Sequence, residues 1–201
     1  VPDLAGRPPF RYPVYMRIDR VVVGMDFSES AASAARWTAR YLAPGEVVLA
    51  HAVDLPQPPA FLRRVLPSGE EVAALAIAEA DRRLHEFAGS VEGQFVCESR
   101  TGTAPQVIAD IAKGREADLI VVGEHGSGRR GRSLLGTTAE RVLACAPVPV
   151  LIAREMPHAA PAAVLTPLDG SPTDGRVLGW GRLLHERYGT RVVACHAVDV
   201  M

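Results

Sequence analysis

The stretch ADLIVVGEHGSGRRGRSLLGTT, residues 117–138, decides the fold that we expect for this chain. It begins with a short apolar run ending at Gly123, which is typical of a strand buried on both faces of a parallel sheet. A glycine-rich segment follows, and Gly136-Thr137-Thr138 then opens a helical pattern that reaches Cys145. The stretch therefore predicts a strand, a glycine-rich loop and a helix in that order.

The same alternation extends over most of the chain. Helices are expected to begin near Ser28 or Ser30, at a Ser68…Glu71 capping box, at Pro105 and at Thr137. Short apolar or β-branched runs between them predict strands at residues 20–24, 47–53, 94–100, 117–123 and 148–154. Regular alternation predicts an α/β fold with a doubly wound parallel sheet.

A partial internal repeat closes the sequence. Asp169-Gly-Ser171 restates Asp26-Phe-Ser28 after 143 residues, and His196-Ala-Val-Asp restates His51-Ala-Val-Asp after 145 residues. We therefore expect an extended arm (1–16), a complete domain (17–154), a linker (155–162) and a truncated second copy (163–201). The second copy is too short to bury a core alone, so either the chain is a fragment of a longer tandem protein or this half-domain packs on another surface.

The glycine-rich loop suits an anion. Glycines let backbone amides approach a phosphate, and the amides and dipole of a helix starting at Gly136 favour negative charge. The alternative is a glycine-rich surface turn. In an open parallel sheet, Asp26 and Gly123 would meet at one crevice if their strands are neighbours. Asp26 would then contact a ribose or base, or it would only form the turn or cap its own helix.

Composition excludes several classes of protein. With 22 basic and 23 acidic side chains and only 5% aromatic residues, we expect no nucleic-acid partner. The longest apolar run, residues 142–153, is interrupted by prolines, so neither a membrane span nor a signal peptide is expected. The three cysteines, each in an apolar stretch expected to be core, indicate a cytoplasmic location. The single lysine, Lys113, stands outside any P-loop motif.

The residues resemble a known family. The spacing Gly123-x2-Gly126-x9-Gly136-Thr137 matches the G-x2-G-x9-G-[S/T] signature of ATP-binding universal stress proteins. The segments VVVGMDFSESA, VVLAHAVD and ADLIVVGEHG are also similar to that family's first strand and turn, second strand and fourth strand. The resemblance covers residues 17–154 as one domain and 163–201 as the start of a tandem copy.

What the resemblance implies is a five-stranded sheet in the order 3-2-1-4-5 that binds ATP, with Mg²⁺ on its phosphates, and regulates a stress response. The residues themselves offer no Ser/His/Asp or Cys/His set at the expected strand ends, so we expect no enzyme and at most slow ATP hydrolysis. A homodimer paired through the edge strand 148–153 is also implied. The implied nucleotide-binding residues are Asp26 at the nucleotide, Ala52 at adenine, Val122, Gly123, His125 and Gly126 at the ribose and phosphates, and Gly136, Thr137 and Thr138 at the phosphates.

Two other functions compete with this one. A G-x-G-x-x-G pattern at residues 126–131, with Glu155 after the next strand, is the fingerprint of an NAD-dependent Rossmann enzyme, although the expected helix starts only at Gly136-Thr137. A nucleotide-free interaction protein of the same fold is favoured by Glu124, whose charge opposes phosphate if it points inward. Arg129, Arg130 and Arg132 either offset this charge or are solvated.

His51 and His196 are interpreted as strand-end histidines making one hydrogen bond each.

Overall fold

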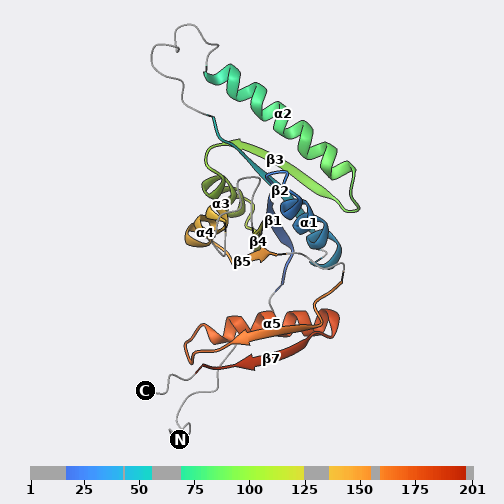
Figure 1. The fold of residues 1–201 in the computed structure, drawn as a ribbon, viewed down its shortest axis with the longest axis vertical. Coiled ribbons are helices and arrows are strands. Elements are labelled where there is room, and N and C mark those ends of the chain that lie inside the picture. Colours follow the sequence, from blue (N-terminus) through green and yellow to red (C-terminus); the bar gives the residue numbers. More distant parts are fainter. Residues whose placement is uncertain (1–16, 43, 56–68, 125–135, 155–158, 198–201) are drawn as a thin grey trace, which may run out of the picture. The chain divides into compact units, whose positions relative to one another are not determined.

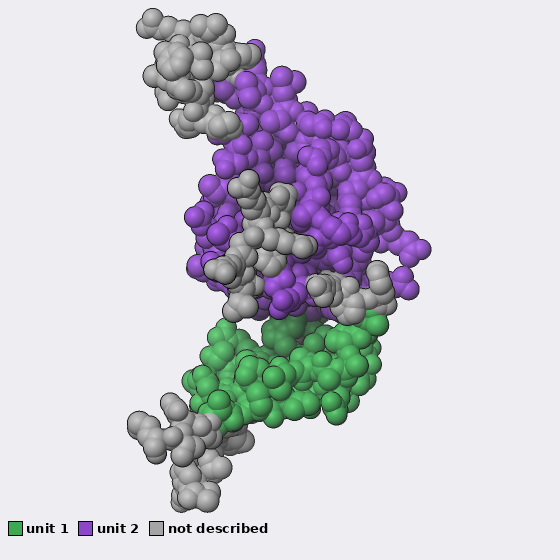
Figure 2. Space-filling view, viewed as in Figure 1, with its two compact units in different colours: residues 1–17, 157–201 green, residues 18–156 purple. Residues whose placement is uncertain are grey.

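The computed structural model describes residues 17–42, 44–55, 69–124, 136–154 and 159–197. The chain divides into two compact units, one of residues 18–156 and the other of residues 1–17 with 157–201 (Figure 2). The larger unit holds the glycine signature, and the smaller one holds the repeat.

Short β-branched runs form the sheet of the larger unit. All five strands are parallel, in the order β3-β2-β1-β4-β5 (Figure 1). The strands are β1 (Arg20–Gly24), β2 (Glu46–Val53), β3 (Phe95–Thr101), β4 (Leu119–Gly123) and β5 (Val150–Ala153). Val22 of the central strand is fully buried and lies in register with Val48 and Ile120. The expected doubly wound sheet and its strand order are confirmed.

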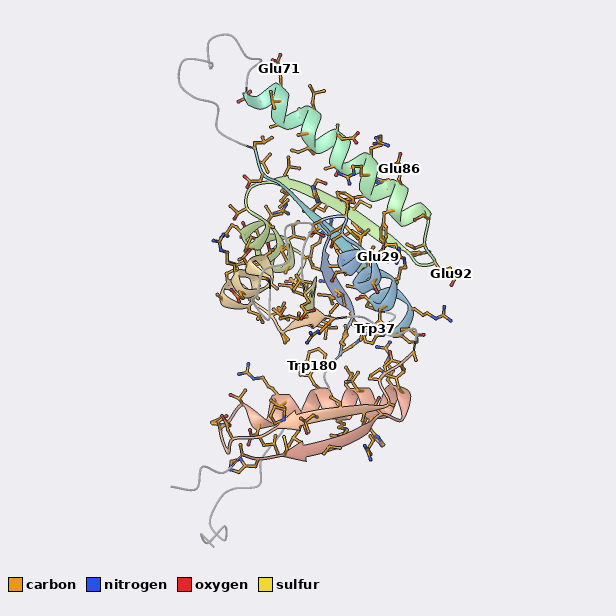
Figure 3. The ribbon with its side chains drawn as sticks, in the orientation of Figure 1. Glu29, Trp37, Glu71, Glu86, Glu92 and Trp180 are labelled. Carbon is orange, nitrogen blue, oxygen red and sulfur yellow. The ribbon has the colours of Figure 1, made fainter. Side chains whose placement is uncertain are left out.

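Helices cover both faces of this sheet. One face carries α1 (Glu29–Trp37), its π-helical continuation η1 (Thr38–Leu42) and α2 (Gly69–Gly89), and the other carries α3 (Ala104–Gly114) and α4 (Thr137–Cys145) (Figure 1). Glu71 and Glu86 project from the exposed face of α2, away from the sheet (Figure 3). The main core cluster lies beneath α3 and α4, where Ile108, Ile111 and Val142 pack over the central strands.

The described residues of the smaller unit form one β-α-β segment. It consists of β6 (Ala163–Pro167), α5 (Asp174–Tyr188) and β7 (Arg191–Cys195), with the two strands parallel. α5 covers the sheet face that contains Thr166, which is 2% exposed. The opposite face presents Leu165, 62% exposed, and Val193, 40% exposed. The expected partial second copy therefore has the β-α-β order of the first domain.

The structure corrects the expected bounds of the last strand in the sheet and the expected burial of the cysteines. β5 starts at Val150 and ends at Ala153, inside the expected range 148–154, because Pro149 has no N–H to donate to a neighbouring strand. Cys145 is exposed, since only Ala139 and Val142 of α4 are buried and the helix ends at Cys145. Cys97 and Cys195 are half-buried. Ser68 of the expected capping box lies outside the described residues.

Candidate functional site

The turn after β1 is built by Asp26, Phe27 and Ser28. The Ser28 N–H donates to Asp26 Oδ1 at 3.0 Å, and the Ser28 hydroxyl accepts from the Ala31 N–H at 3.2 Å as the N-cap of α1. Phe27 adopts a left-handed conformation with φ of 62°, which non-glycine residues rarely adopt. Asp26 thus has the turn-forming role expected from its type, and it stands at the carboxyl end of the central strand.

An aromatic and cationic stack flanks this turn. The Phe27 ring lies 4.8 Å from the His51 ring, and Arg83 of α2 places its guanidinium carbon 3.8 Å from the Phe27 ring centroid. His51 Nδ1 lies 2.7 Å from the Met25 carbonyl oxygen, so this nitrogen carries the proton and donates. His51 is therefore the hydrogen-bonded strand-end histidine that the sequence predicts.

A pocket of about 100 Å³ opens beside the turn. It lies at the carboxyl ends of β1, β2 and β4, where the chain reverses the direction in which it adds strands. Ligands of doubly wound sheets bind at this point. Its lining includes five of the residues that the resemblance implies: Asp26, Ala52, Val122, Gly123 and Thr138.

Glycines keep the backbone of this region close to its neighbours. A Cβ on Gly123 would lie 2.6 Å from Ser30 Oγ and 3.2 Å from the Ala31 backbone nitrogen. A Cβ on Gly24 would lie 2.8 Å from Ile108 Cδ1. At Gly24, α3 therefore approaches the end of β1 directly.

The N-terminus of α4 stands over the same edge of the sheet. Gly136 is its N-cap and makes no side-chain cap, while its N–H donates to the Glu124 carbonyl at 2.8 Å. This bond joins the two ends of the glycine-rich loop. Gly136 and Thr137 adjoin Thr138, which lines the pocket. The free amides and dipole of this helix end favour an anion.

The Glu124 carboxylate is held on the other side of β4. Arg154 Nε lies 3.1 Å from Glu124 Oε1, and the Glu124 side chain is only 12% exposed. Arg154 follows β5, whereas the pocket lies between β4 and β1. The charge of Glu124 is therefore paired rather than directed at the pocket.

His125 and Gly126 lie outside the described residues, as do Arg129, Arg130, Arg132 and Glu155. Sequence reasoning missed the pocket-lining residues Met25, Ala104 and Ile108. Ala104 and Ile108 belong to the first turns of α3, which follows β3 at the same edge. Their helical spacing of four residues, directly after a strand end, is the signal that could have found them.

Within the described ranges, no group of three His, Cys, Asp or Glu side chains could hold a metal ion. No helix among these same residues is long and apolar enough to span a bilayer.

In doubly wound α/β proteins, a pocket at the strand-order reversal is where ligands bind, and a helix N-terminus beside it favours an anion. The sequence model of the Universal stress protein family matches residues 17–154. The chain belongs to the universal stress protein family.

Curated relatives and solved structures agree with this assignment. A universal stress protein of Mycolicibacterium smegmatis is 31% identical over 192 residues, covering 90% of this chain and 64% of that protein. One of Mycobacterium tuberculosis is 33% identical over 199 residues, covering 90% and 65%. This chain thus spans less than two thirds of either relative.

Among solved structures, UspA from Lactobacillus plantarum is 26% identical with a TM-score of 0.55, covering 69% of this chain and 99% of that one. A universal stress protein from Archaeoglobus fulgidus shares the fold over 92% of this chain and 69% of its own, with a TM-score of 0.74 and 18% identity. A third, of 21% identity and TM-score 0.51, covering 70% of this chain and all of its own, was crystallised in complex with cAMP.

Proposed function

We propose that this chain binds ATP in the pocket between β1 and β4 and acts as a nucleotide-dependent regulator of a stress response. The observation that carries the proposal is the convergence of Asp26, Ala52, Val122, Gly123 and Thr138 on one pocket at the strand-order reversal. The same fold holds an adenine nucleotide in the cAMP complex of its structural neighbour.

The residues fit an adenine nucleotide by their chemistry. The pocket lining includes small and apolar groups, Ala52, Ile108 and Val122, which suit a planar base. Asp26 is at the ribose, and Gly136, Thr137 and Thr138 offer backbone amides and hydroxyls to the phosphates. Mg²⁺, when bound, neutralises the phosphate oxygens and is held mainly by them, since the described residues offer no metal-binding cluster.

Hydrolysis of ATP by this site is at most slow. Lys113, the only lysine, is in the last turn of α3, about 14 Å along the helix from Ala104 at the pocket. It is therefore remote from the phosphates. His51, the histidine at the pocket, donates its Nδ1 proton to a backbone carbonyl rather than pairing with a nucleophile. Binding and release, rather than chemistry, would carry the signal.

The test begins with the purified protein. Denaturation should release adenine nucleotide, and calorimetry with ATP and Mg²⁺ should give one site per chain. Gly136→Val should abolish binding while the circular dichroism spectrum stays unchanged, because the side chain blocks close approach of phosphate to the α4 N-terminus. Gly114→Val is the matched control, since nothing lies within 4 Å of a Cβ there. A folded protein without ATP binding would instead be the nucleotide-free interaction protein.

We further propose that residues 163–201 form a truncated second copy in a tandem organisation, with residues 17–154 as the complete domain. Hydrogen bonds repeat across the two units. The Ser171 N–H donates to Asp169 Oδ1 at 2.9 Å as Ser28 does to Asp26, and His196 Nδ1 lies 2.6 Å from the Leu168 carbonyl as His51 does from Met25. At the position of Phe27 stands Gly170 with φ of 82°.

The quaternary state and location complete the proposal. β5 is the last strand of its sheet, and we expect its apolar residues to pair with the same strand of a second copy. Light scattering should then give the mass of a dimer, and Leu151→Lys should give a monomer.

The cysteines Cys97, Cys145 and Cys195 are free thiols, which agrees with the proposed cytoplasmic location.

A further inference from the structure

Glu124 closes the glycine-rich loop through its backbone. Its N–H donates to the Ala153 carbonyl at 2.9 Å, and its carbonyl accepts from the Gly136 N–H at 2.8 Å. The residue is thus hydrogen-bonded both to the end of β5 and to the start of α4. Any displacement of Glu124 would move the α4 N-terminus, which is the proposed phosphate site.

The backbone of Glu124 bonds the start of α4, so an unpaired negative charge on this residue would disfavour an anion at the proposed phosphate site. The side chain of Glu124 is largely shielded from water, and partial burial strengthens its repulsion of a nearby anion. The repulsion grows with the charge of the ligand, so it penalises ATP more than AMP and leaves uncharged adenosine unaffected. A paired guanidinium removes most of this penalty.

We propose that Arg154 determines how much phosphate charge the pocket tolerates, by neutralising Glu124 and holding its carboxylate toward β5. The ion pair joins the ends of β4 and β5, on the far side of β4 from the pocket. Arg154 is not among the described residues that line the pocket, and it acts through Glu124 as a positioning residue. This inference rests on nucleotide binding as proposed above.

The test uses ligands that differ only in charge. Dissociation constants for adenosine, AMP, ADP and ATP are measured by calorimetry at low salt without Mg²⁺. Arg154→Gln should leave the dissociation constant for adenosine within about twofold of the wild-type value and raise that for ATP about tenfold. The changes for AMP and ADP should lie between these two. Raising the salt concentration should shrink this difference. Arg182→Gln, which removes the exposed ion pair of Arg182 with Glu186, is the matched control.

A second variant separates charge from structure. Glu124→Gln/Arg154→Gln keeps the backbone bonds and removes both charges, so ATP affinity should return to within about twofold of the wild type. Equal weakening of adenosine and ATP by Arg154→Gln would overturn the inference, because it would indicate a structural role only. Unchanged ATP affinity in that variant would overturn it too. A wild-type protein that binds none of the four ligands would reject the proposed function itself.

Discussion

Gly123 brings the end of β4 close to α1. Replacement by alanine puts a Cβ 2.6 Å from Ser30 Oγ and 3.1 Å from Ser30 Cβ. We expect Gly123→Ala to lower the free energy of unfolding by about 1–3 kcal/mol, the usual cost of overpacking. Urea unfolding measures this.

Two variants make that measurement specific. Gly114→Ala should be neutral or slightly stabilising, because nothing lies within 4 Å of its Cβ and alanine favours a helix. Gly123→Ala/Ser30→Ala should recover part of the loss. A Gly123→Ala protein as stable as the wild type would contradict the packing of β4 against α1.

Cys97 is a thiol of low reactivity. Partial burial in β3 raises its pKa, and the nearby carboxylate of Asp81 raises the pKa further. The thiol therefore stays protonated at pH 8, where exposed thiols begin to ionise. We expect iodoacetamide to modify exposed Cys145 well before Cys97, as followed by peptide mass spectrometry. Asp81→Asn should speed the modification of Cys97, and an equal rate for both cysteines in the wild type would contradict the prediction.

The site residues differ in how far the sequence could predict them. Asp26, Gly123 and Thr138 stand at strand or helix ends, and parallel strands bring such ends to one edge. Ile108 reaches the pocket only because Gly24 lets α3 approach β1, a packing detail that spacing alone does not contain. The direction of the Glu124 side chain also depends on a contact between two separate strands, so the sequence left it open.

At the scale of elements, the sequence patterns predict the strands and α-helices that the structure describes in the larger unit, while the ends of these elements depend on their neighbours. β5 starts later than expected because Pro149 has no N–H to donate to a neighbouring strand. α1 continues into the π-helical turn η1, whose Thr38 hydroxyl is buried with no partner in the described structure. The π-helical hydrogen bonding of η1 depends on packing, and no residue pattern in the segment predicts it.

β3 is tied to α3 by an ion-pair network around Glu98. Burial raises the pKa of Glu98, but hydrogen bonds from Arg100 and Arg115 outweigh it, so the net pKa lies below its ordinary value of 4.5. Ionised Glu98 therefore stabilises the fold above about pH 4.5, and this contribution is lost as the pH falls through the folded-state pKa. We expect Glu98→Gln to lower the free energy of unfolding by about 1 kcal/mol at pH 7.

The pH dependence distinguishes this network from a packing effect. The difference between wild type and Glu98→Gln should shrink as the pH is lowered from 7 to 3, measured by urea unfolding at each pH. Glu116→Gln is the matched control, because its carboxylate is 86% exposed and pairs weakly with Arg20 at 3.4 Å. A difference that stays constant with pH would refute the charge argument.

At the scale of the whole molecule, the repeat gives two copies of one strand pair in different surroundings. Leu165 stands 143 residues after Val22, and Val193 stands 145 residues after Val48. Val22 and Val48 are fully buried beneath α3, whereas Leu165 is 62% and Val193 is 40% exposed. The sequence predicted this copy. It did not predict which face of the β6-β7 sheet is exposed, because that depends on which face α5 covers.

The matched pair Val22→Ala and Leu165→Ala tests whether that face is open in solution. Val22→Ala removes two buried methyl groups from the core and should lower the free energy of unfolding of its unit by about 2 kcal/mol. Leu165→Ala removes exposed atoms and should change stability by less than about 0.5 kcal/mol. Hydrogen exchange resolves each unit separately, and β6 and β7 amides should exchange faster than those of β1 and β2. Comparable losses from the two substitutions would mean that the Leu165 face is covered in the working protein.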